Sequence, residues 1–223
     1  MIGPSHDCIV IPARGLAVGK SRLAATLTTS ERERLNRQLL EHVLQVALSA
    51  FRFPDGCPRP GVGVVVVSPD PATLAFALER GGSPLLEPSA LGLNAAIDWA
   101  ARHVAVMGAA RVLVLPADLP LLEVGDVHAL LEGDPREVVI APDVADSGTN
   151  GLRFPLDRGF QAAFGNGSCQ AHRTVATARG LTWRCLRRPG LARDIDTPDD
   201  LSAWRMGSPL LAAQPPALTA QAA

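Results

Sequence analysis

The residues best suited to chemistry are acidic side chains next to apolar segments. An apolar run at residues 111–115 ends in Pro116-Ala117-Asp118. An aspartate just past a buried strand lies where a divalent cation can be held beside phosphates. The alternative is that Asp118 only caps the following turn. Taken alone, this motif does not decide between the two interpretations.

A second acidic group follows late in the chain, at Arg193-Asp194-Ile195-Asp196-Thr197. If this segment is extended, Asp194 and Asp196 project from the same face, because side chains alternate with period two. Two carboxylates that close repel each other unless a cation lies between them. Magnesium ions that also bind phosphates would supply that cation. The neighbouring Asp199 and Asp200 are explained by the favourable position of negative charge in the first turn of a helix.

A basic, glycine-containing loop follows the first apolar run and includes residues 14–22. It misses the Walker A pattern by one residue, because only three residues separate Gly15 from Gly19. Backbone N–H groups of such a loop, with Lys20 and Arg22, could still bind a triphosphate. Lys20 is the only lysine among the 21 basic residues, and a compact ammonium does what a guanidinium cannot. A surface turn with two exposed cations is the alternative.

Two loops combine glycine with hydroxyl side chains, at residues 146–151 and 164–168. The second opens a predicted helix, so Ser168 is a candidate N-cap with neighbouring N–H groups facing an anion. A plain helix cap is the alternative. Ser168 and His172 have the i, i+4 spacing of helical neighbours, but no G-x-S-x-G elbow supports a hydrolase.

The elements that must position these residues alternate between strand and helix. Ser30 and Glu33 predict a capping box for the first helix, and apolar residues then repeat every four positions. Such alternation predicts an α/β fold with a mainly parallel sheet covered on both faces, with ligands at the carboxyl ends of the strands. Expected strands are 8–12, 62–67, 111–115, 138–141 and 181–186, and expected helices are 30–50, 71–80, 93–104, 168–179 and one starting at 197–198.

Composition narrows the function classes. The chain has 223 residues, 47% of them apolar, and a net charge of −1, as expected for a globular protein. No run of basic residues favours a nucleic-acid partner, and no apolar stretch or signal peptide predicts a membrane or secreted location, so a cytoplasmic protein is expected. The four cysteines form no C-x-x-C pair, so they are interpreted as incidental thiols. Residues 1–206 are expected to form the domain, and the Ala- and Pro-rich residues 207–223 a disordered tail.

Taken together, the motifs resemble the family of 2-phospho-L-lactate and phosphoenolpyruvate guanylyltransferases of coenzyme F-420 biosynthesis. The resemblance spans residues 8–204 and depends on six motifs occurring in this order. They are Gly19-Lys20-Ser21-Arg22-Leu23, Gly92-Leu93-Asn94-Ala95-Ala96, Pro116-Ala117-Asp118-Leu119-Pro120, Gly148-Thr149-Asn150, Phe164-Gly165-Asn166-Gly167-Ser168 and Asp194-Ile195-Asp196-Thr197-Pro198.

The resemblance implies a three-layer, glycosyltransferase-A-like (Rossmann-like) nucleotidyltransferase fold. It implies transfer of GMP from GTP to a small phosphorylated acid: phosphoenolpyruvate, 2-phospho-L-lactate or 3-phosphoglycerate. It also implies roles for particular residues: two Mg²⁺ ions on Asp118, Asp194 and Asp196, the acid on Thr149, Gly165 and Ser168, and the guanosine near Gly92 and Asn94.

The chain departs from the family pattern at Gly151, where alanine is usual, and at Asn166, where proline is usual. Another stretch that differs is Ala13-Arg14-Gly15-Leu16. Because Gly151 and Asn166 fall in the expected acid-binding loops, the identity of the acid stays open. Transfer to a molybdopterin or sugar phosphate, and a non-catalytic nucleotide-binding module, are the alternatives. A homodimer is also left open.

Overall fold

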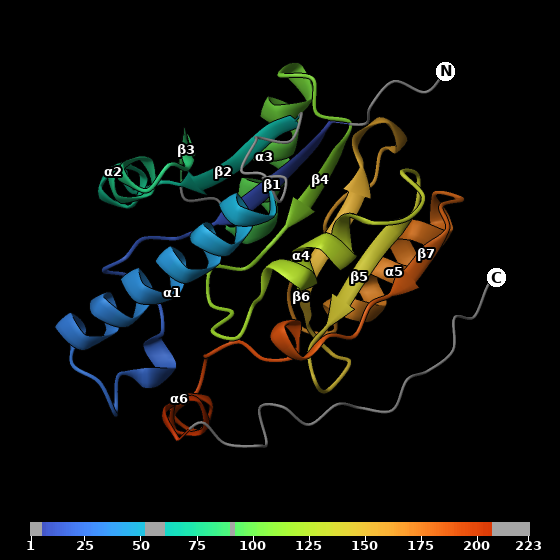
Figure 1. Cartoon of the computed structure of the whole chain (residues 1–223). Helices are drawn as coiled ribbons and strands as arrows, with labels where there is room; N and C mark the ends of the chain where they lie inside the picture. The colour runs from blue at the N-terminus through green and yellow to red at the C-terminus, as the bar shows by residue number, and fades with distance from the viewer. Residues whose placement is uncertain (1–5, 52–60, 90–91, 207–223) are drawn as a thin grey trace.

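The computed structural model describes residues 6–51, 61–89 and 92–206, along which strands and helices mostly alternate (Figure 1). The strands are β1 (Asp7–Pro12), β2 (Gly61–Ser68), β3 (Ser83–Leu86), β4 (Arg111–Val114), β5 (Val138–Pro142), β6 (Thr149–Pro155) and β7 (Trp183–Cys185). The α-helices are α1 (Thr29–Ala50), α2 (Pro71–Glu79), α3 (Leu93–Val106), α4 (Val124–Leu131), α5 (Ser168–Ala178) and α6 (Pro198–Arg205). Three short 3-10 turns are η1 (Ser21–Leu23), η2 (Leu156–Arg158) and η3 (Pro189–Leu191).

Within the described residues, the strands form one seven-stranded sheet in the order β3-β2-β1-β4-β6-β5-β7. Neighbouring strands run parallel except at β6, which is antiparallel to both β4 and β5. The expectation of a mainly parallel sheet is therefore confirmed, with one reversed strand in its middle.

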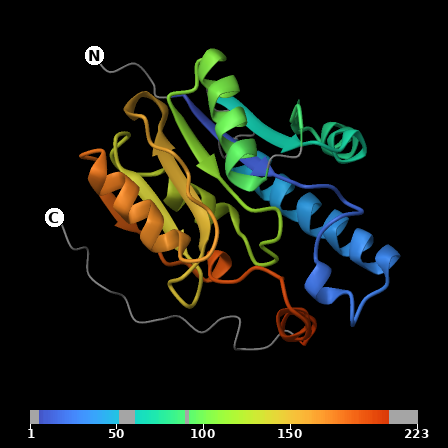
Figure 2. The ribbon, with the colours of Figure 1, turned by 180° about the vertical axis from the view of Figure 1, so that it is seen from behind.

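Both faces of this sheet are buried under helices. Alternate side chains of the central strands enter two different cores, so that Ile9 and Ile11 pack with α1 while Cys8 and Val10 pack with α3. Helices α1 and α4 lie on the face turned to the viewer in Figure 1, and α3 and α5 cover the other face in Figure 2. Three layers result, as the resemblance implied.

Several local features differ from the sequence-based expectation. Strands β3 and β6 and helix α4 were not predicted. The predicted capping box of Ser30 and Glu33 is wrong: the N-cap of α1 is Thr28, whose hydroxyl accepts from the Glu31 N–H. Thr28 has extended backbone angles and the helix begins at Thr29, so Ser30 already lies within the first turn. The expected disordered tail at 207–223 lies outside the described residues, and among the described helices none is both long and apolar enough to span a membrane.

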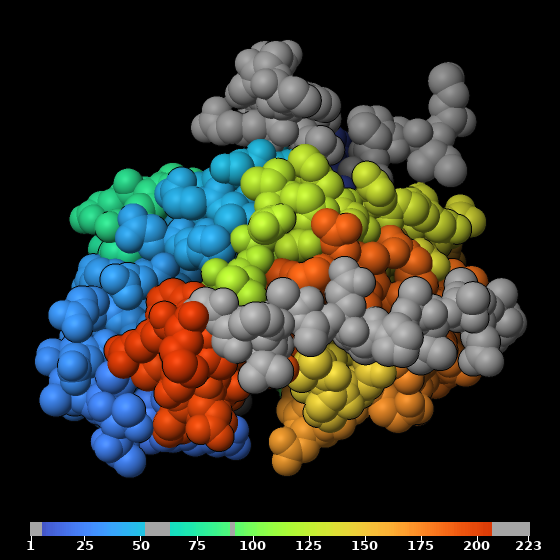
Figure 3. Space-filling model, turned by 60° about the horizontal axis from the view of Figure 1, so that its bottom comes forward, coloured from blue at the N-terminus to red at the C-terminus, as the bar shows by residue number. Residues whose placement is uncertain are grey.

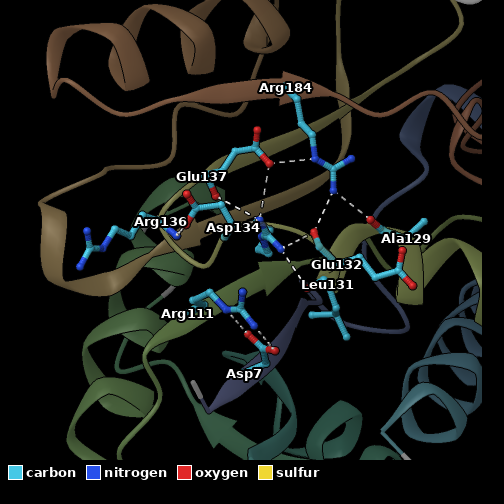
Figure 4. Close-up of polar contacts among 10 residues, drawn as sticks. Asp7, Arg111, Ala129, Leu131, Glu132, Asp134, Arg136, Glu137 and Arg184 are labelled. Carbon is cyan, nitrogen blue, oxygen red and sulfur yellow. Dashed lines mark hydrogen bonds and ion pairs between the residues drawn. The ribbon is translucent and has the colours of Figure 1, made fainter. Parts of the chain in front are cut away.

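A buried arginine on β6 ties this reversed strand to the end of α4. The Arg153 side chain is fully buried and donates to the carbonyl oxygens of Leu131, Glu132 and Asp134 at 2.8–2.9 Å. Figure 4 shows these carbonyl groups together with Glu137, whose carboxylate also binds Arg184. Burial lowers the pKa of Arg153 only to about 10, so its guanidinium stays charged and satisfies carbonyl groups that the helix end leaves unpaired.

We expect Arg153→Met to reduce the free energy of unfolding by about 3 kcal/mol, because the helix-end carbonyl groups would lose their buried donor. Urea unfolding of the full chain measures this change. Arg136→Met is the matched control: Arg136 is exposed on the same turn, and its loss should change stability by no more than about 0.5 kcal/mol. Equal, small losses in both variants would contradict this role of Arg153.

Candidate active site

The residues singled out in the sequence come together at one edge of the sheet. Lys20 and Asp118 follow the carboxyl ends of β1 and β4, and Asp194 and Asp196 follow β7. Because β6 runs antiparallel to β4, with Val114 opposite Leu152, its amino end at Thr149 lies at this same edge. A reversed strand therefore adds a hydroxyl side chain to an edge that otherwise collects the carboxyl ends of parallel strands.

Polar contacts with two helices fix the loop after β1. The Leu16 N–H donates to the Thr73 hydroxyl at 3.0 Å, and the Asn36 amide donates to the Leu16 carbonyl at 2.9 Å. Lys20 itself has φ +50°, a left-handed conformation that is uncommon for residues other than glycine. These contacts hold the loop in a defined shape that directs Lys20 toward the sheet edge.

Three carboxylates and one ammonium group form the centre of the site. Oxygen atoms of Asp118, Asp194 and Asp196 all lie within 4.8 Å of one another. Lys20 Nζ lies 2.5 Å from Asp118 Oδ2 and 3.1 Å from Asp196 Oδ1, and its side chain is only 8% exposed. Arg22 is 72% exposed and approaches Asp196 at 3.8 Å. The structure thus brings five residues from three distant segments together.

The charges of this cluster are unbalanced. Burial, together with the neighbouring carboxylates of Asp118 and Asp196, raises the pKa of Asp194 to about 6. Burial lowers the pKa of Lys20, but Asp118 and Asp196 outweigh this effect and the net shift is upward, so Lys20 stays protonated. Carboxylate oxygens are the ligands that hard divalent cations prefer. The three carboxylates therefore form a donor set that could hold a metal ion, and a bound cation would reduce the repulsion among them.

Backbone contacts position the Asp194–Asp196 pair. Ile195 between them is buried, and its N–H donates to the carbonyl group of Asp118 at 3.2 Å. The Asp200 carboxylate accepts from the N–H groups of Asp196 and Thr197, as part of the capping box of α6. Ile195 is buried while the carboxylates of Asp194 and Asp196 both join the cluster, which agrees with the prediction that the two aspartates share one face.

Helix α6 packs against the early part of the chain and so completes this side of the site. Leu201 on α6 and Ile195 share a small core with Leu23 of η1 and Leu35 and Leu39 of α1. Figure 3 shows α6 (red) seated against this early segment (blue), with a hollow between them and the loops drawn in yellow and orange. Residues far apart in the sequence thus form one wall of the site.

A second polar group lies where β6 meets α5. The Ser168 hydroxyl donates to Thr149 Oγ1 at 3.2 Å, and His172 Nδ1 lies 3.1 Å from the same oxygen. The predicted N-cap role of Ser168 is wrong, because Gly167, with φ +72°, is the N-cap and Ser168 is the first helical residue. The i, i+4 pair of Ser168 and His172 was noticed in the sequence, but the residue that joins them is Thr149.

A β-bulge turns Thr149 toward α5. The partners Ala141–Gly151 and Pro142–Thr149 leave Asn150 as an extra residue on β6. Without the bulge, Thr149 would share the face of Gly151, which lies against Leu130 of α4. Gly151, where the chain departs from the family pattern, therefore faces α4 and not the Thr149–Ser168 pair.

The start of α3 is joined to the loop before α5. Asn94 Oδ1 accepts from the Phe164 N–H at 2.7 Å, and its amide donates to the Phe164 carbonyl at 2.9 Å. Gly92, with φ +100°, is the N-cap of α3, and Gly165, with φ +138°, follows Phe164. The sequence did not indicate this pairing, which makes Asn94 a support for the 164–168 loop.

Comparison with known proteins agrees with this geometry. A family model described as "Guanylyl transferase CofC like" matches residues 7–207. A phosphoenolpyruvate guanylyltransferase from Sphaerobacter thermophilus is 42% identical over 193 residues, 86% of this chain and 89% of the relative. A 3-phospho-D-glycerate guanylyltransferase from Phenylobacterium zucineum is 34% identical over 197 residues, 86% of each chain.

The fold is shared more widely. A nucleotidyl transferase from Methanothermobacter thermautotroptrophicus superposes with a TM-score of 0.63 at 14% identity, covering 92% of this chain and 98% of the other. At this identity the likeness concerns the fold alone. The sequence matches over nearly all of the chain go further, and they show that this protein belongs to the CofC-like guanylyl transferase family.

Proposed function

We propose that the protein is a guanylyltransferase, which transfers GMP from GTP to a small phosphorylated acid and releases pyrophosphate. The observation that carries this proposal is the cluster of Asp118, Asp194 and Asp196 with Lys20 at the ligand-binding edge of the sheet. The acid is phosphoenolpyruvate, 2-phospho-L-lactate or 3-phosphoglycerate, since relatives are named for two of these. The family supports a role in coenzyme F-420 biosynthesis, and we propose a cytoplasmic location for the reaction.

The reaction is an in-line attack by a phosphate oxygen of the acid on the α-phosphorus of GTP. The new P–O bond forms as the bond to the β-phosphate breaks, and pyrophosphate leaves with the electron pair. Because the attacking phosphate is already ionised at neutral pH, no general base is required. Positioning and charge neutralisation are what the protein must supply.

The carboxylates and Lys20 supply the charge neutralisation. Asp118, Asp194 and Asp196 would hold Mg²⁺, in our proposal two ions, which when bound neutralises charge on the attacking and leaving oxygens. The Lys20 ammonium has three donors, of which Asp118 and Asp196 take two. Among the described residues its third N–H has no acceptor and can donate to the triphosphate, and the exposed Arg22 adds positive charge at the same place.

The remaining site residues are assigned to the two substrates. Thr149, Gly165 and Ser168 would bind the phosphorylated acid at the amino ends of β6 and α5. Gly92 and Asn94 stand at the start of α3 on the same edge of the sheet, and we assign them to the guanosine side. Because Asn94 bonds the Phe164 backbone, it would also link the nucleotide and acid sides.

Measurement of pyrophosphate release with GTP and a panel of acids tests this function. The panel contains the three acids above, a sugar phosphate and a molybdopterin, with ATP, CTP and UTP as alternative donors. Release with GTP and one of the three acids, in the presence of Mg²⁺, is the expected result. Release only with the other acceptors would identify a different transferase, and nucleotide binding without release would identify a non-catalytic module.

We expect Asp118→Asn to lower kcat at least about a thousandfold, because the isosteric amide removes the charge that holds the metal and the partner of Lys20. Steady-state kinetics and a thermal melt measure activity and folding separately. The control is Asp199→Asn, which changes an exposed aspartate on α6 outside the cluster. Near wild-type turnover by Asp118→Asn would remove Asp118 from the reaction.

Lys20→Arg should lower kcat about a hundredfold although the charge is kept, because a planar guanidinium cannot place its donors on two carboxylates and a phosphate as a compact ammonium does. Arg34→Lys, at an exposed position of α1, is the reciprocal control and should leave kcat unchanged. If Lys20→Arg were as active as the wild type, only charge, and not ammonium geometry, would matter at this position.

A further inference from the structure

We propose that His172 is a positioning residue for the acid substrate: it locks the hydroxyl pair of Thr149 and Ser168 in the arrangement that presents one hydroxyl proton to an anionic oxygen. This inference deepens the proposed function and rests on it. His172 does not touch the substrate in this account but acts through Thr149.

The contacts of His172 determine which ring nitrogen carries the proton. The backbone N–H of Ala163 lies 2.9 Å from Nε2, and an amide N–H can only donate, so Nε2 is the acceptor. The His172 side chain is completely buried, and burial lowers its pKa to about 4, so the ring is neutral at physiological pH. The single ring proton is therefore on Nδ1, which donates to Thr149 Oγ1 at 3.1 Å.

Counting protons shows what this tautomer does to the hydroxyl pair. Thr149 and Ser168 carry two hydroxyl protons between them, and the bond that joins them at 3.2 Å uses one. Because Nδ1–H fills a lone pair of Thr149, neither hydroxyl has to donate to His172. Because Ser168 donates in the bond between them, the Thr149 proton finds no acceptor among the described residues, and a phosphate or carboxylate oxygen can accept it.

The opposite tautomer would reverse this outcome. With the proton on Nε2, Nδ1 would be an acceptor and would take the Thr149 proton, while the Ser168 proton would go to Thr149. The pair would then offer only lone pairs to an incoming anion, which would be repelled. The Ala163 N–H excludes this arrangement, because a protonated Nε2 would face another donor at 2.9 Å.

The surroundings hold the ring in this orientation. The Phe164 ring packs edge-on against His172 with centroids 4.9 Å apart. The Phe164 backbone is itself held on both sides by Asn94, and the adjacent Ala163 supplies the N–H that binds Nε2. The position of residues 163–164 therefore determines the tautomer of His172, and the His172 ring in turn holds the Ala163 N–H in place.

The tautomer can be observed directly, without substrate. Long-range ¹H–¹⁵N correlation spectra of the full-length protein labelled in its five histidines distinguish Nδ1–H from Nε2–H rings. Loss of one ring system in His172→Asn assigns the signal. We expect an Nδ1-protonated, neutral ring at pH 7, and an Nε2-protonated or positively charged ring would overturn the proposal.

Kinetics then test whether the tautomer serves acid binding. His172→Phe keeps an aromatic ring but removes the donor, and should raise the KM for the acid about tenfold while the KM for GTP changes less than about twofold. His172→Asn should recover part of the loss, because its amide can donate from near the position of Nδ1. His128→Phe is the matched control, since His128 contacts a backbone carbonyl on α1, across the sheet, and should leave both KM values unchanged.

A double-mutant cycle with Thr149→Val separates positioning from general structural support. If His172 acts through the Thr149 hydroxyl, His172→Phe should add little to the acid KM once that hydroxyl is gone. An equal rise in the acid KM with and without the Thr149 hydroxyl, or equal rises in the KM values of both substrates, would overturn the role of His172. The proposed function itself would still stand. If the wild type transferred GMP to none of the acids, the proposed function would fail and this role with it.

Discussion

Repulsion among three carboxylates at one edge of the sheet is the constraint on which this site depends. Asp118 lies 76 positions before Asp194 in the sequence, and Asp196 lies two positions after Asp194. The oxygen atoms of all three nevertheless lie within 4.8 Å of one another. Such a group is unfavourable unless positive charge compensates it. Lys20 provides part of that charge in the structure, while burial and then the carboxylates of Asp118 and Asp196 raise the pKa of Asp194.

Much of the surrounding fold serves to keep these groups together. The buried strands β1 and β4 bring Lys20 and Asp118 to the same edge, and the Ile195–Asp118 backbone contact fixes the third segment against them. The reversed strand β6 and its bulge add Thr149 on the side of α5. Three carboxylates that could hold a cation and a pair of hydroxyl groups thus lie along one edge, an arrangement that suits the proposed joining of two phosphorylated molecules.

How much of this could be predicted follows from the kind of signal each residue carries. The apolar runs of β1, β2 and β4 and the amphipathic pattern of α1 depend on local sequence, so the alternating α/β architecture was evident. Strand β6 was missed because it begins with polar residues and contains Arg153, whose burial is possible only with the carbonyl groups at the end of α4. Strand β3 was missed because it is short, contains Pro84 and is mostly exposed.

The same difference between local sequence signals and tertiary contacts applies to the residues of the site. Asp118, Asp194, Asp196 and Lys20 could be singled out because charged residues beside apolar strands are conspicuous in a sequence. The contacts of His172 and Asn94 could not, because each depends on a backbone group of residues 163–164 that only the tertiary structure brings near. The bulge at Asn150 has no sequence signature here, and without it Thr149 would have been placed on the wrong face.

The most direct measurement is a crystal structure of the protein with Mn²⁺ and a GTP analogue that cannot be cleaved at the α-phosphorus. Anomalous scattering would locate the metal independently of any assumption about the ligands. The account predicts a metal in direct contact with Asp118 and with the Asp194–Asp196 pair, and in contact with the triphosphate. Metal and triphosphate bound away from these carboxylates would contradict it.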